Sequence, residues 1–172
     1  MQARRMKPTA PTWQRTPAPP GLGAVLEFMR ELWAMEHALQ RASKRMESTL
    51  GVTGPQRLVI RVIGKFPGIS AGDLSEVLCT HPSTLTGILK RLEASHAIRR
   101  DAHPLDGRRA LLYLTPAGVQ LDRMQEGTVE ASVRRVLGGL PAARVNIVSA
   151  VLRQLSEGLS SSPVSAVARR RR

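Results

Sequence analysis

Hydrophobic residues along most of this chain recur at intervals of three and four, the spacing of helices that bury one face. Between residues 22 and 50 this spacing predicts one long helix that ends at Gly51. A capping box of Thr53 and Gln56 predicts a second helix, which continues to about residue 65. Further helix starts at Ser70 and at His81-Pro82 predict a short third helix and a fourth that includes residue 94.

The spacing changes after the fourth helix. Residues 97–100 and 110–114 are short strand-like runs on either side of a charged loop, which predicts a β-hairpin. Helical spacing then returns, predicting a helix from Pro116 to about Val136 and a last one from Pro141 to about Leu159. The predicted fold class is therefore mainly α with a small β-hairpin wing, a winged helix-turn-helix region with additional flanking helices.

The two ends of the chain lack any such pattern. Residues 1–20 contain five prolines, and residues 160–172 end in four arginines, so both are predicted to be disordered basic arms. The 172 residues carry a formal net charge of +13, of which the arms hold eight. The folded part is then residues 21–159, and the positive balance favours a polyanionic partner, either nucleic acid or an anionic membrane.

The amino-acid composition excludes several classes of protein and of functional site. No apolar run approaches the ~20 residues of a membrane helix, which predicts a cytoplasmic protein without a membrane partner. The single cysteine, Cys79, excludes an internal disulfide and is expected to be buried or half-buried and inert. No metal-ligand set, catalytic constellation or cofactor motif is present, so we expect no metal, no cofactor and no enzymatic activity. Five aromatic residues are too few for a single-strand binder, which favours duplex DNA.

The fourth helix carries the candidate DNA-reading residues. Four aliphatic residues between Leu85 and Leu92 form one stripe, and the opposite face is small, hydroxylated and basic. Such a helix fits the major groove, while an arginine at the hairpin tip can reach the adjacent minor groove. The candidate DNA-binding residues are Pro82, Ser83, Thr84, Thr86, Lys90, Arg91, Arg100, Asp106, Arg108 and Arg109.

Four short motifs then follow one another at characteristic distances. They are Leu-Gly-Val-Thr-x-x-Gln from residue 50, Pro-Ser-Thr-Leu-Thr-Gly from residue 82, Arg-Leu-Glu from residue 91, and Asp-x-Arg-Arg from residue 106 ahead of Leu-Thr-Pro-x-Gly. Each motif is weak alone, but their order and spacing over residues 50–118 closely resemble the MarR family of bacterial transcription regulators. Where the family has glycine after the recognition helix, this chain has His96, for which we expect a positive φ.

The resemblance implies a homodimeric repressor that binds a pseudo-palindromic operator. Residues 21–50 and 116–159 would form the dimerisation helices, and residues 53–115 the winged helix-turn-helix region. By the family pattern, Arg108 enters the minor groove and Asp106 orients it through a charge-assisted hydrogen bond. Relatives are released by small aromatic or phenolic ligands, and the candidate effector-binding residues are Trp33, His37 and Arg41, one helical turn apart.

Several alternatives stay open at this point. The protein could be a sequence-tolerant architectural DNA-binding protein driven by its basic arms, associated with the nucleoid in either case. Trp33, His37 and Arg41 could serve simple helix packing, and Lys90 and Arg91 could form a solvated face.

Overall fold

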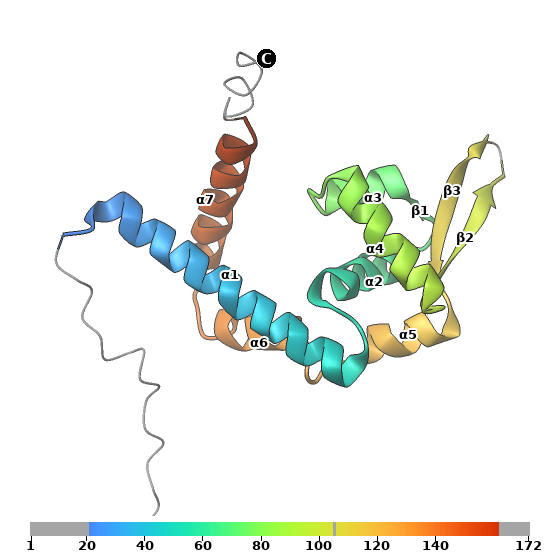
Figure 1. Cartoon of the computed structure of the whole chain (residues 1–172), viewed down its shortest axis with the longest axis horizontal. Coiled ribbons are helices and arrows are strands. Elements are labelled where there is room, and N and C mark those ends of the chain that lie inside the picture. Colours follow the sequence, from blue (N-terminus) through green and yellow to red (C-terminus); the bar gives the residue numbers. More distant parts are fainter. Residues whose placement is uncertain (1–20, 105, 162–172) are drawn as a thin grey trace, which may run out of the picture. The chain divides into compact units, whose positions relative to one another are not determined.

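The computed structural model describes residues 21–104 and 106–161, and at Gly107, Arg108 and Ser161 it describes the backbone alone. Both predicted arms fall largely outside this range, since residues 1–20 and 162–172 are not described. Seven helices and three strands occupy the described part (Figure 1). They are α1 (Gly23–Leu50), α2 (Gly54–Lys65), β1 (Ile69–Ser70), α3 (Ala71–Val77), α4 (Pro82–Ala94), β2 (Ile98–His103), β3 (Asp106–Leu114), α5 (Pro116–Arg123), α6 (Val129–Leu137) and α7 (Ala142–Ser161).

The chain divides into two units, Met1–Ala38 and Leu39–Arg172. The described part of the first unit is residues 21–38, the beginning of α1, in which every residue from Gly23 to Ala38 is exposed. The second unit contains the remaining helices and all three strands.

Helices α2 and α3 start where the sequence predicts, because side chains satisfy their first free N–H groups. Thr53 accepts from the backbone N–H of Gln56 at 3.4 Å, and the Gln56 side chain accepts from the N–H of Thr53 at 2.8 Å, which completes the capping box. Ser70 caps α3 by accepting from the Asp73 N–H at 3.2 Å.

The core lies between α2, α3, α4 and the sheet. The inward stripe of α4 packs against aliphatic residues of α2 and the first residues of the wing, where nearly all side chains are fully buried. The core residues are Val52, Val59, Ile60, Ile63, Leu74, Leu85, Leu89, Leu92, Ala97, Ile98 and Leu112. This packing fixes α4 with its polar face outward, as its sequence pattern predicts.

The wing is a three-stranded antiparallel sheet in the order β1-β3-β2. The sequence predicts a hairpin but not β1, whose two residues are too few to show a period; Ile69 pairs with Leu112 of β3. Strands β2 and β3 pair from Ile98 opposite Leu114 to His103 opposite Asp106, so the strands are longer and the tip is shorter than predicted.

The predicted single helix from Pro116 to Val136 is wrong, because the chain forms two helices, α5 and α6. At Met124 the backbone becomes extended, with φ −63° and ψ 128°, and Gly127 has a φ of +70°. A helix cannot continue through such conformations, and Thr128 caps a new one by accepting from the Ala131 N–H at 3.2 Å.

Two residues other than glycine have a positive φ within the described range. His96 has a φ of 55°, which confirms the expectation from its place after the recognition helix. Cys79 has a φ of 47°, and its side chain is exposed rather than buried or half-buried as predicted. The left-handed turn between α3 and α4 takes this side chain away from the apolar run that precedes it.

Candidate nucleic-acid interface

Helix α4 presents a continuous exposed face to solvent. His81 caps the helix with its imidazole, which accepts from the N–H of Ser83 at 3.3 Å, and Pro82 occupies the first turn. On the inward side Leu85, Leu89 and Leu92 are buried. All six predicted contact residues of this helix lie on the exposed side: Pro82, Ser83, Thr84, Thr86, Lys90 and Arg91.

Two hydroxyl groups on this face already hold hydrogen bonds within the helix. Thr86 donates to the carbonyl oxygen of Pro82 at 2.8 Å, and the Ser83 hydroxyl lies 2.8 Å from Nδ1 of His81. A threonine hydroxyl that donates its only proton internally keeps just acceptor lone pairs and a methyl group. Thr86 is therefore suited to base amino groups or a thymine methyl, and not to a phosphate oxygen.

Lys90 and Arg91 supply the positive charge of the α4 face. Among the residues that the structure describes, neither has a carboxylate within 4.0 Å, whereas several neighbouring arginines are paired. A cation without an internal partner can bind a phosphate without first losing an ion pair. These two side chains are thus placed as the sequence predicts.

The wing arginines differ in their surroundings. Nε of Arg100 donates to Oε1 of Glu93 at 2.6 Å, and both side chains are about one third exposed. This ion pair ties β2 to the end of α4, and the predicted DNA contact of Arg100 stays a prediction. The more exposed Arg109 approaches Oδ2 of Asp73 only to 3.8 Å.

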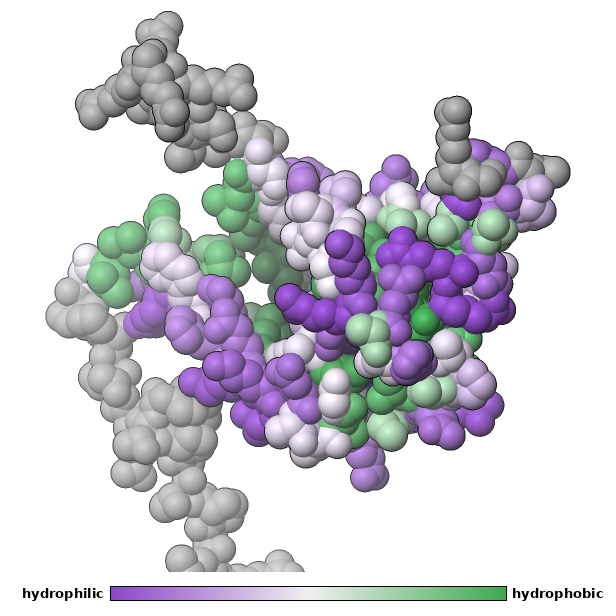
Figure 2. Space-filling model, turned by 45° about the vertical axis from the view of Figure 1, so that its right-hand side comes forward, coloured by the Kyte–Doolittle hydropathy of each residue, from purple (hydrophilic) through white to green (hydrophobic). Residues whose placement is uncertain are grey.

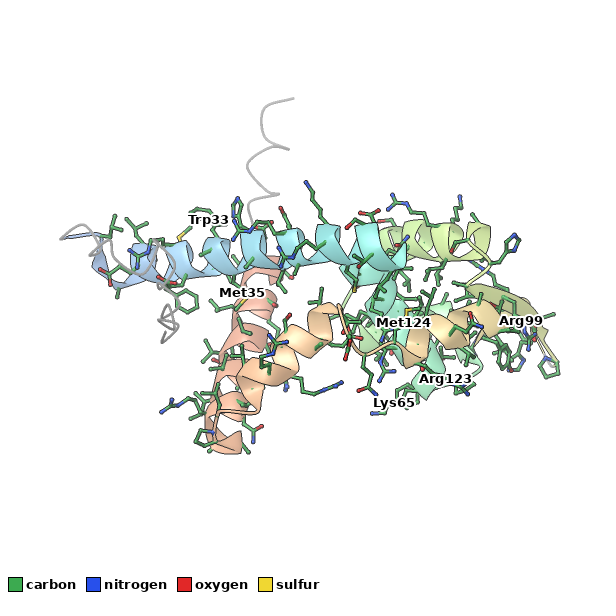
Figure 3. The ribbon with its side chains drawn as sticks, turned by 90° about the horizontal axis from the view of Figure 1, so that it is seen from below. Trp33, Met35, Lys65, Arg99, Arg123 and Met124 are labelled. Carbon is green, nitrogen blue, oxygen red and sulfur yellow. The ribbon has the colours of Figure 1, made fainter. Side chains whose placement is uncertain are left out.

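On the opposite face of the wing, the guanidinium of Arg99 lies 4.7 Å from the ring centre of Tyr113, its cross-strand partner. Figure 3 shows Arg99 on the wing. The same side chain forms an ion pair with Asp101. Arg99, which the sequence reading did not single out, therefore braces the sheet.

The hairpin tip is described only in part. Asp106 begins β3 and is exposed, and Arg108 belongs to the same strand, but its side chain lies outside the described residues. The expected orientation of Arg108 by Asp106 therefore stays a prediction.

Arg57 on α2 is a charged residue that sequence reasoning missed. It is 2% exposed, and its guanidinium donates to Glu130 of α6 and to three backbone carbonyls at the end of α5. A basic residue in the first turn of a helix opposes the helix dipole, and this was the only sequence signal available.

The predicted effector residues begin in the first unit. Trp33 is 56% exposed and projects from the side of α1 opposite to Met35 (Figure 3). Nδ1 of His37 lies 2.8 Å from the carbonyl oxygen of Trp33. Arg41 is exposed and belongs to the second unit.

A cavity of about 280 Å³ lies within the second unit, between the end of α1 and the start of α6. Arginines, hydroxyl groups and small apolar side chains line it, a combination that suits a small organic anion. The lining residues are Ala42, Arg45, Thr49, Gly127, Thr128, Val129, Ala131, Ser132 and Arg135, so none of the three predicted effector residues takes part.

Two further findings concern the described residues, 21–104 and 106–161. No group of three or more His, Cys, Asp or Glu side chains is placed to hold a metal ion in that part of the chain. None of the helices in the same range combines the length and the hydropathy that crossing a membrane requires.

Comparison with known proteins identifies the protein family of this chain. The sequence profile of the MarR family matches residues 52–110. An HTH-type transcriptional repressor of Mycobacterium tuberculosis is 31% identical over 108 residues, which cover 63% of this chain and 78% of that protein. The HTH-type transcriptional regulator TtmR of Methylorubrum extorquens is 36% identical over 87 residues, 51% of this chain and 45% of the relative.

Solved structures share the fold at lower identity. The S. aureus MepR–DNA complex has a TM-score of 0.65 at 16% identity and covers 76% of this chain and 97% of its own. The PcaV regulator of Streptomyces coelicolor, in complex with its natural ligand, has a TM-score of 0.62 at 22% identity and covers 77% of this chain and 91% of its own. With its exposed α4, its wing and these relatives, the chain belongs to the MarR family of winged-helix transcriptional regulators, which are DNA-binding proteins and not enzymes.

Proposed function

We propose that this regulator is a homodimeric repressor that binds a pseudo-palindromic operator in duplex DNA, in the cytoplasm and associated with the nucleoid. The observation that carries the proposal is the exposure of apolar side chains on helices outside the winged-helix core. In Figure 2 exposed hydrophobic (green) surface is visible on the left-hand side of the view. Soluble chains rarely leave such surface uncovered.

The exposed apolar residues lie on the helices that were predicted for dimerisation. In the first unit α1 exposes seven large apolar side chains, from Val25 at 73% to Leu32 at 36%. In the second unit α6 exposes Val136 at 67%, and α7 exposes Ile147 at 65% and Val148 at 51%. A second copy of the chain would cover these faces and bring two α4 helices to two half-sites.

Light scattering tests the dimer. Wild type should run at twice the 18.8 kDa chain mass, whereas a variant with Val148→Glu and Leu152→Glu should run as a monomer and lose operator binding. Ser149→Glu, an exposed polar position on the same helix, is the matched control and should stay dimeric. A monomeric wild type would refute the proposal.

Gel-shift titration tests whether the protein recognises the base sequence of its operator. Arg108→Ala should weaken binding to the selected operator by about 1–3 kcal/mol, with the loss concentrated at the bases under the wing. The alternative, an architectural protein, predicts that removing residues 1–20 and 160–172 abolishes nearly all binding. A repressor should instead keep operator preference with a shallower salt dependence.

We further propose that a small aromatic or phenolic acid releases the repressor, and the cavity between α1 and α6 favours this role. Arg45 and Arg135 can hold a carboxylate there, while Ala42 and Val129 contact a ring. The predicted set of Trp33, His37 and Arg41 is the competing site.

Calorimetric titration with benzoate distinguishes the two sites. Arg45→Met with Arg135→Met should abolish binding if the cavity is the site. Loss in Trp33→Ala with His37→Ala, and no loss in the arginine variant, would place the ligand on α1 instead.

A further inference from the structure

Arg57 occupies a place where arginine is costly. It lies in the first turn of α2, where a positive charge opposes the helix dipole, and its side chain is 3% exposed. Such a burial is tolerated only when the charge is fully hydrogen-bonded. The partners of Arg57 therefore indicate what it is there to hold.

The partners are the end of α5 and the start of α6. Nε donates to Oε1 of Glu130 at 2.6 Å, and Nη2 donates to the carbonyl oxygens of Met124 at 2.5 Å and Asp122 at 3.2 Å. Nη1 donates to the carbonyl oxygen of Leu121. One side chain from the DNA-reading region thus joins two helices that lie more than 60 residues further along the chain.

These carbonyls are the ones that a continuous helix would use. In an α-helix the oxygens of Leu121, Asp122 and Met124 accept from the N–H groups four residues later, at 125, 126 and 128. Arg57 supplies donors to the same oxygens, so the carbonyls of Leu121 and Asp122 stay paired although the helix ends at Arg123. Figure 3 shows Met124 where α5 ends and the chain turns toward α6.

Helix α2, which carries Arg57, is fixed by three sets of contacts. The capping box fixes its first turn, and the N–H of Gly54 donates to Oγ of Ser43 on α1 at 2.7 Å. Other residues of α2 pack against α4 in the core. We therefore expect a change at Arg57 to alter the angle between α5 and α6 while the surface of α4 stays as it is.

We propose that Arg57 is a positioning residue that sets the half-site spacing of the operator. By fixing the α5–α6 angle it fixes the winged-helix region relative to the dimerisation helices, and so the separation of the two α4 helices in a dimer. This inference rests on the proposed homodimer. A dimer reads half-sites about 34–36 Å apart, so a small change in angle corresponds to a base pair of spacing.

The test uses the full-length protein and the operator selected by wild type from random duplexes. Half-site spacing is then varied by one and two base pairs in either direction, and affinity is measured for each duplex. Wild type should have one optimum, with a loss of at least about tenfold at a change of one base pair. The variant R57M/E130Q should give a flat or shifted profile, with its half-site sequence preference unchanged.

A second variant reaches the same junction without touching Arg57. Gly127→Ala removes the residue that adopts φ +70°, and an added Cβ meets no atom within 4 Å, so it disfavours the break without a clash. It should likewise flatten or shift the spacing profile. Gly23→Ala, at φ +73° and equally free of neighbours, is the matched control and should leave the profile unchanged.

The outcomes separate the possible roles of Arg57. A purely structural arginine would lower affinity equally at all spacings, and a folded, dimeric R57M/E130Q with the wild-type optimum would overturn the inference. If that variant does not fold, Gly127→Ala decides in the same way. A wild type with no preferred spacing would instead refute the proposed dimeric repressor, and the role of Arg57 with it.

Discussion

Replacing Gly118 by alanine measures how closely α5 packs against the wing. Gly118 is buried in the first turn of α5, and a Cβ built on it would lie 1.9 Å from the carbonyl oxygen of Ala97. That distance is more than 1 Å too short for a carbon and an oxygen. The oxygen belongs to the backbone and the backbone fixes the position of the Cβ, so neither atom can rotate away. The helix and the strand must therefore move apart.

The separation disrupts the hydrogen bonds that join them. Two hydrogen bonds are affected: the N–H of Thr115 donates to the carbonyl oxygen of Ala97 at 3.1 Å, and the Thr115 hydroxyl donates to that of His96 at 2.5 Å. Each such bond contributes about 1 kcal/mol, and overpacking adds about 1–3 kcal/mol. Gly118→Ala should thus lower the free energy of unfolding by about 3–5 kcal/mol, a large part of the stability of a typical domain.

Urea unfolding followed by circular dichroism measures this change. The control is Gly87→Ala in α4, where a Cβ meets nothing within 4 Å; it should raise stability by about 0.5–1 kcal/mol. If Gly118→Ala loses less than about 1 kcal/mol with an unchanged m-value, the close approach of α5 to the wing is refuted.

Three further outcomes are expected. Gly87→Ala should weaken operator binding in gel shifts while it stabilises the fold, because the new methyl group lies on the half-buried margin of the DNA-facing helix; equal affinity would place that margin away from the duplex. Glu93→Gln should release Arg100 from its 2.6 Å ion pair and steepen the salt dependence of binding by about one phosphate contact, measured by fluorescence anisotropy; an unchanged slope would mean that Arg100 faces no phosphate. Thr53→Ala should cost about 1 kcal/mol in urea unfolding, since α2 loses its cap, and a loss near zero would contradict the role of the capping box.

Features that depend on neighbours in the chain could be predicted from the sequence. The capping box at Thr53 and the inward stripe of α4 use residues at most four apart, and the structure has both as expected. The positive φ of His96 was likewise predictable from its place after α4. In each instance the local sequence contains all the atoms that decide the conformation.

The features that were missed depend on distant partners. At the break after Arg123, the guanidinium of Arg57 donates to carbonyls 64–67 residues away. The spacing of hydrophobic residues across 116–136 does not show that a distant side chain donates there. It therefore predicted one continuous helix. Strand β1 likewise exists only because β3 offers Ile69 and Ser70 an edge to pair with.

The arginines of the winged-helix region differ in their burial and in their ion-pair partners. Arg57 is buried and pairs with Glu130. Arg100 has a side chain about one third exposed and pairs with Glu93, and Arg91 is exposed with no carboxylate within 4.0 Å in the described structure. The free energy gained on binding a phosphate should therefore be smallest for Arg57 and largest for Arg91, because an internal ion pair must break before an external one forms. Operator affinity should therefore depend more on Arg91 and Lys90 than on the net charge of +13, most of which lies in the two ends of the chain.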